Sequence, residues 1–116
     1  MAKDDYYVIV GKILLFLYRK LKGREGRNTL EYLVPNSKDF PIRSEYFDYV
    51  IRHMHKDGML ENVALTAMPD GEPLTVYITE DTQITPKGID YLQSNSRIAK
   101  VMEHIPEALE IVGQFV

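Results

Sequence analysis

The 116-residue sequence contains no cysteine, and this absence excludes three classes of protein together. Thiol catalysis, cysteine-ligated metal centres and disulfide-stapled folds all need the missing residue. Long hydrophobic runs are also missing, because the longest apolar stretch, Tyr6–Tyr18, is interrupted by Lys12 and is shorter than the roughly 20 residues that cross a bilayer. The amino-terminal end carries Asp4 and Asp5, whereas a secretory signal begins with positive charge. We therefore expect a soluble cytoplasmic protein without a membrane partner.

Basic residues are scarce in the second half of the chain. Residues 1–60 carry eleven Lys or Arg and eight Asp or Glu, whereas residues 61–116 carry three and nine, which gives the formal net charge of -3. The densest basic run lies between Arg19 and Arg27. Such a run either attracts phosphate or forms a solvated helix end, and the sequence leaves both interpretations open. Length and average composition indicate one globular domain with its own core.

Hydrophobic residues at helical spacing predict two helices in the first third of the chain. The first covers Asp4–Leu21 and ends at Gly23, a residue that readily adopts the left-handed conformation of a helix stop. Gly11, in its middle, indicates the close approach of a neighbouring helix. Asn28 and Glu31 have the spacing of a capping box and predict the start of a second, short helix.

A third helix and a β-hairpin follow. Ser44 is the expected N-cap of the third helix, which ends at Asp57-Gly58. Its inner face is predicted to consist of Phe47, Val50, Ile51 and Met54. The hydrophobic period then changes to two over residues 63–67 and 74–78, with a turn at residues 69–73, which predicts paired strands. Thr85 followed by Pro86 marks the start of a fourth helix that continues to Gln93.

The last segment, residues 96–116, has a strong amphipathic pattern that Pro106 interrupts, so we expect a kinked or broken helix. Two interpretations of its apolar face stay open. In the first, residues 96–116 pack on the first helix of the same chain, within the domain formed by residues 1–95. In the second, they pack on a second subunit and form a homodimer. The predicted dimer interface consists of Ile98, Val101, Ile105, Leu109 and Val112.

The order helix, short helix, helix, hairpin, helix is that of a winged helix-turn-helix. We therefore expect an α+β, mainly α fold with a three-helix core, a two-stranded wing and further C-terminal helices. Local sequence agrees with this order. The stretch Ile84-Thr85-Pro86-Lys87-Gly88-Ile89-Asp90-Tyr91-Leu92 looks like the leucine-threonine-x-x-glycine-x-x-tyrosine-leucine opening of the helix after the wing in many winged-helix regulators, with Ile84 in place of leucine. Phe47-x-x-Val50-Ile51-x-x-Met54-x-x-x-Gly58-Met59-Leu60 similarly resembles a recognition helix and its glycine stop.

Together these stretches resemble the YjcQ-like family, small winged-helix proteins of Gram-positive bacteria and their phages, over about residues 4–112. The resemblance implies a winged-helix fold and a cytoplasmic, phage-linked context. It transfers no catalytic residues. The sequence departs from DNA-binding proteins of this fold at the expected wing tip, where Asp70 and Glu72 stand in place of basic residues.

Catalysis and metal binding have little support in the sequence, and we expect neither an enzyme nor a cofactor. The serines lie in turn or cap contexts without a Gly-x-Ser-x-Gly elbow. His53 and His55 are two positions apart on a predicted helix, so their side chains point about 200° apart and do not share a metal ion. His104 lies close to Glu103 and Glu107 in sequence, which ordinary surface electrostatics explains.

Duplex DNA and a protein are the two candidate partners. The residues predicted to contact DNA are Tyr49, Arg52 and Lys56 on the third helix, with Arg24 and Arg27 in the basic run. Glu45 and Asp48 oppose this interpretation, because they occupy the half of the helix that approaches bases and repel phosphate. A DNA-binding transcriptional regulator and a non-enzymatic protein-interaction module of winged-helix shape therefore both stay open, because fold alone does not decide function.

Overall fold

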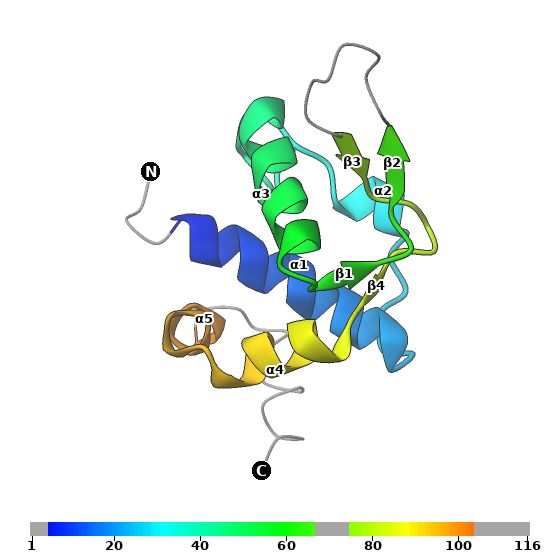
Figure 1. The fold of residues 1–116 in the computed structure, drawn as a ribbon. Coiled ribbons are helices and arrows are strands. Elements are labelled where there is room, and N and C mark those ends of the chain that lie inside the picture. Colours follow the sequence, from blue (N-terminus) through cyan, green and yellow to red (C-terminus); the bar gives the residue numbers. More distant parts are fainter. Residues whose placement is uncertain (1–4, 67–74, 104–116) are drawn as a thin grey trace.

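The structure is a computed structural model, and it describes residues 5–66 and 75–103 (Figure 1). Within these ranges the chain is mainly helical with two small antiparallel sheets, an α+β arrangement. The helices are α1 (Asp5–Leu21), α2 (Thr29–Tyr32), α3 (Ser44–Lys56), α4 (Pro86–Ser94) and α5 (Ser96–Met102). The strands are β1 (Leu60–Glu61), β2 (Ala64–Thr66), β3 (Thr75–Tyr77) and β4 (Gln83–Ile84). The predicted order of three helices, a hairpin and further helices is confirmed.

Helix α1 is the centre of the core. It contacts α3, α4, α5 and β4, and Figure 1 shows α3 on one side of it and α4 on the other. Because neighbours cover several of its sides, the buried residues go beyond the predicted stripe and include Leu15 and Phe16. The helix ends at the predicted stop, Gly23, whose φ of 72° is the left-handed conformation that glycine adopts without steric cost.

Asn28 occupies the predicted N-cap position of α2, whereas the predicted N-cap of α3, Ser44, is wrong. The Asn28 side chain makes no capping hydrogen bond to α2. Instead, the Leu30 amide at the start of α2 donates to Glu80 Oε1 at 3.1 Å, so a carboxylate fifty residues away in sequence satisfies this helix end. Helix α3 is preceded by Arg43 at the N-cap position, and Ser44, its first residue, donates its hydroxyl to the Glu45 carboxylate at 3.1 Å.

The hairpin contains two separate ladders. The predicted pairing is confirmed between β2 and β3, where Leu65 faces Val76. A second ladder, which the sequence pattern did not predict, pairs β1 with β4 and places Leu60 opposite Ile84. Five residues, 78–82, connect the ladders on one strand, whereas Asn62 and Val63 connect them on the other.

Asn62 closes the connection between the two ladders. Its φ of 60° is left-handed, and its carbonyl oxygen accepts hydrogen bonds from the hydroxyls of Thr79 and Thr82, both at 3.0 Å. The Thr79 amide donates in turn to Thr82 Oγ1 at 2.9 Å. These bonds fold residues 79–82 into a turn that projects from the hairpin and holds Glu80 toward α2.

The segment Ile84–Leu92 connects the hairpin to α4. Thr85 is the predicted N-cap: it accepts a hydrogen bond from the Gly88 amide at 3.1 Å, and its hydroxyl donates to the Gly58 carbonyl. Its amide donates to the Met59 carbonyl at 3.0 Å, which holds the start of α4 against the end of α3. A Cβ on Gly88 would lie 2.7 Å from the same Met59 oxygen, so this position admits only glycine without displacement.

Helix α5 packs on α1 within the same chain. A Cβ on Gly11 would lie 3.7 Å from Ile98 Cδ1 and 3.8 Å from Val101 Cγ1, which confirms the predicted close approach of a helix at this glycine. Ile98 is fully buried and Val101 is buried. This corrects their assignment to a dimer interface, because side chains covered by their own subunit offer no surface to a second one. Ile105, Leu109 and Val112, with the predicted kink at Pro106, lie outside the described residues.

Candidate interaction surface

The outward face of α3 carries the three helix residues predicted to contact a partner. The burial of Phe47, Val50, Ile51 and Met54 against the core turns the opposite side of α3 outward. Tyr49 is 45% exposed, Arg52 is half-buried and Lys56 is exposed. The Arg52 guanidinium lies 5.7 Å from the centre of the Tyr49 ring, within the range of a cation–π contact.

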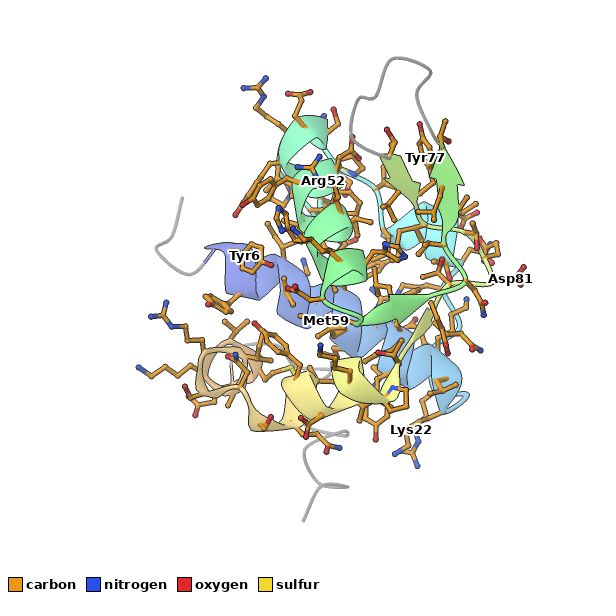
Figure 2. All side chains as sticks on the ribbon, in the orientation of Figure 1. Tyr6, Lys22, Arg52, Met59, Tyr77 and Asp81 are labelled. Atoms are coloured by element: carbon orange, nitrogen blue, oxygen red, sulfur yellow. The ribbon has the colours of Figure 1, made fainter. Side chains whose placement is uncertain are left out.

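The two loop arginines do not join this surface. Figure 2 shows Arg52 on α3 and Lys22, at the end of α1, on opposite sides of the molecule, and Arg24 and Arg27 follow Lys22 in the loop to α2. The five residues predicted as one DNA-binding set therefore lie in two separate regions.

Arg27 is held inside its own loop. Its Nε and Nη2 donate to the two oxygens of Glu25 at 2.8 and 2.9 Å, and its guanidinium lies 3.9 Å from the centre of the Tyr32 ring. Arg19 approaches the same carboxylate at 3.5 Å. Hydrogen bonding to Arg27 is the main cause that lowers the pKa of Glu25 to about 2. Much of the basic run thus stabilises the α1–α2 loop, and only Arg24 keeps an exposed position without a described side-chain contact.

Carboxylates divide the α3 face. Glu45 and Asp48 are exposed on the first half of the helix, and Glu45 forms an ion pair with Arg43 at 2.5 Å. The Ser44 hydroxyl, followed by Arg43, lowers the pKa of Glu45, so this group is charged at neutral pH. Cations occur on the second half, at Arg52 and Lys56. The charge on this face is therefore negative over the first half of α3 and positive over the second half, so α3 does not present a continuous basic strip.

Aromatic side chains of α3 lie around Tyr49. The Tyr49 ring centre lies 4.3 Å from that of His53 and 6.3 Å from that of Tyr46, one turn to either side on α3. Tyr6 of α1 and Tyr91 of α4 interact electrostatically with each other, and Tyr6 also interacts with Tyr49. We call this set, together with Arg52, the tyrosine face. Figure 2 shows two of its members, Tyr6 and Arg52, on the side of the molecule away from Asp81.

The Tyr6 and Tyr91 hydroxyls of the tyrosine face are protonated at neutral pH. Burial is the largest cause that raises the pKa of Tyr6, followed by the neighbouring Tyr91 and Asp57. Burial and then Tyr7 raise the pKa of Tyr91 in the same way. Both phenols thus remain hydrogen-bond donors beside the Asp57 carboxylate at the end of α3.

The sequence patterns identified Tyr49 and Arg52 but missed the rest of this face. In the sequence, Tyr6 stands out only as the start of the longest apolar stretch, and Tyr91 only as part of the segment after the wing. Both are partly buried and pack against the core cluster, so the hydrophobic period does not separate them from core residues. Eight tyrosines in 116 residues are the one compositional signal of this surface.

A hollow of about 580 Å³ lies on another part of the surface, between α1 and the base of the hairpin. Most polar groups that line this hollow already form hydrogen bonds within the chain. The Lys20 ammonium donates to a loop carbonyl at 2.8 Å, Glu80 accepts from the start of α2, and the Thr79 and Thr82 hydroxyls donate to Asn62. We therefore place the candidate surface on the tyrosine face.

Within residues 5–66 and 75–103, His, Asp and Glu side chains form no group of three or more that is arranged to hold a metal ion. None of the helices in these ranges has the length and apolar character needed to cross a membrane.

Comparison with known proteins places the chain in a family. Searches of curated proteins and of solved structures gave no significant match. A family model described as YjcQ protein matches residues 12–111, which include α1 from Lys12 onward and every other helix and strand described above. The chain therefore belongs to the YjcQ protein family.

Proposed function

We propose that this protein is a non-catalytic interaction domain of winged-helix topology that binds a protein partner through its tyrosine face. The element order supports the topology: α1, α2 and α3 form the three-helix unit, β2 and β3 the wing, and α4 and α5 the addition that covers α1. In this arrangement α3 occupies the position of the recognition helix.

The composition of the tyrosine face is the single observation that carries the proposal. Tyr, His and Arg side chains lie together, partly exposed, around the 45% exposed ring of Tyr49. Tyrosine and arginine are enriched at the energetic centres of protein interfaces, because they bury a large area at a low entropy cost and keep a polar end. Tyr6, Tyr46 and Tyr91 also pack against the core, so less side-chain entropy is lost when a partner binds.

Duplex DNA is the competing ligand, and the charges disfavour it. A duplex lying along α3 would meet Glu45 and Asp48 before it reached Arg52 and Lys56. The loop cations that would add phosphate contacts lie on the opposite side of the molecule, and Arg27 is paired with Glu25 there. Asp70 and Glu72, at the expected tip of the wing, add negative charge in sequence.

The proposal is tested by comparing two exposed tyrosines. Tyr49 and Tyr77 have similar exposure, 45% and 52%, but Tyr77 lies on β3, outside the tyrosine face. A protein retained from a lysate of the encoding organism is purified, and its affinity is measured for the wild type, Tyr49→Ala and Tyr77→Ala. We expect Tyr49→Ala to weaken binding at least about tenfold and Tyr77→Ala to leave it unchanged.

The same proteins are titrated with fluorescent random duplex DNA at two salt concentrations. We expect no binding at either concentration. If the wild type binds DNA and the Arg52→Glu variant does not, the result would contradict the proposal and support a transcriptional regulator. Equal partner affinities of Tyr49→Ala and the wild type would also contradict it.

A further inference from the structure

One edge of the wing has no partner within the described residues. Strand β2 pairs with β3 on one side, and Figure 1 shows β3 between β2 and α3. On its other side, the backbone groups of Ala64, Leu65 and Thr66 make no hydrogen bond to the rest of the described chain. All three residues are exposed. An exposed edge of this kind is a template for a further strand.

Apart from its length of three residues, the edge carries none of the features that usually prevent strand addition. Residues 62–68, Asn-Val-Ala-Leu-Thr-Ala-Met, contain no charged residue and no proline. Leu65 is 49% exposed, although Val76, opposite it in the ladder, is only 6% exposed. The apolar face of the sheet therefore continues past the core to an uncovered leucine at the outer strand.

We propose that β2 pairs antiparallel with β2 of a second copy of this chain, about a two-fold axis through Leu65. In this register Leu65 lies opposite the Leu65 of the second copy, and Ala64 lies opposite Thr66. Every pair along Ala64–Thr66 is uncharged, so two chains that each carry a net charge of -3 meet where like charges do not oppose each other. A basic or an acidic peptide finds no opposite charge on this edge, whereas the edge itself is self-complementary.

The paired edges form a small interface, so the dimer is weak and its population depends on concentration. The pairing joins the two wings into one four-stranded sheet and leaves both tyrosine faces free, because that face lies on α1, α3 and α4. The inference is thus independent of the proposed function.

Disulfide trapping tests the predicted register directly, because the chain has no native cysteine. In antiparallel strands directly opposite Cα atoms lie about 4.5–5.5 Å apart, within the range that a disulfide bridges. We expect Leu65→Cys to form a covalent dimer at least ten times faster than Leu30→Cys, a control at a 52% exposed position on α2. Equal rates would overturn the proposal.

Charge substitution at Leu65 provides a second test by sedimentation over a wide range of concentrations. We expect the wild-type mass to rise from 13.4 kDa toward twice that value, while Leu65→Lys and Leu65→Glu each remain monomeric. An equimolar mixture of the two variants should dimerise again, because Lys then faces Glu at the axis, and this rescue also shows that both variants are folded. A wild type that stays monomeric throughout, a dimer that survives Leu65→Lys, or a mixture without rescue would each refute the pairing.

Discussion

Alanine substitution should have opposite effects at two buried helical glycines, Gly88 of α4 and Gly11 of α1. Both residues lie within helices, where alanine is intrinsically favoured over glycine by about 1 kcal/mol. The surroundings of the added methyl group decide whether the free energy of unfolding rises or falls, and these surroundings differ between the two sites.

At Gly88 a Cβ would lie 2.7 Å from the Met59 carbonyl oxygen and 2.8 Å from Ile84 Cγ1. The oxygen belongs to the backbone and accepts the Thr85 amide, so no change of rotamer relieves the contact. Overpacking of this kind costs about 1–3 kcal/mol. Weakening of the Thr85 hydrogen bond adds about 1 kcal/mol, and the helical preference of alanine returns up to about 1 kcal/mol. We expect Gly88→Ala to lower the free energy of unfolding by about 1–3 kcal/mol.

At Gly11 the nearest atoms to a Cβ are Ile98 Cδ1 at 3.7 Å and Val101 Cγ1 at 3.8 Å. These are ordinary van der Waals distances, so the methyl group fills space instead of displacing α5. We expect Gly11→Ala to raise the free energy of unfolding by about 1 kcal/mol, mainly from helix propensity.

Urea denaturation followed by circular dichroism measures both changes, with the slope of the transition as a check that the unfolded state is unaltered. The two substitutions are chemically identical, so their difference of about 2–4 kcal/mol isolates the packing effect. A neutral Gly88→Ala, or a Gly11→Ala that destabilises the protein, would refute the description of the α3–α4 junction or of the α1–α5 contact.

Two further predictions concern carboxylates. Interactions with Arg27 and Arg19 lower the pKa of Glu25 from its ordinary value of 4.5 to about 2, so the stabilisation is present above pH 5 and is lost as the pH falls toward 2. Glu25→Gln should therefore destabilise the protein at pH 7 by about 1–2 kcal/mol and reduce the pH dependence of unfolding between pH 5 and 2, which urea titrations at several pH values measure. Glu80→Ala should lower the free energy of unfolding by about 0.5–1 kcal/mol and accelerate hydrogen exchange of the Leu30 amide. The control substitution Asp81→Ala should leave this exchange rate unchanged.

Residues whose role depends on neighbours in sequence were predictable. The hydrophobic period defined α1 and α3, the change to a period of two located β2 and β3, and Thr85-Pro86 marked the start of α4. Each of these signals acts within one element, so it needs no knowledge of tertiary contacts.

Features that depend on contacts between distant segments were not predictable. Asn28 and Glu31 have capping-box spacing, yet the cap of α2 comes from Glu80. The tyrosine face combines side chains from three helices, and no local pattern brings Tyr6 and Tyr91 together. The pairing of β1 with β4 escaped detection because a two-residue strand is too short to show a period.

The break in the hairpin at Asn62 separates a ladder that is buried in the core from a strand that is exposed. The inner ladder is fixed by Leu60 and Ile84, which are buried in the core. Beyond Asn62, β2 is wholly exposed, so substitutions on this strand alter the surface without disturbing the core. Its partner β3 differs, because Val76 is buried in the core. The outer ladder is thus exchangeable only at its exposed strand: grafting the exposed β2 residues between members of the YjcQ family, with the buried Val76 kept, should transfer surface properties while the recipient keeps its own stability.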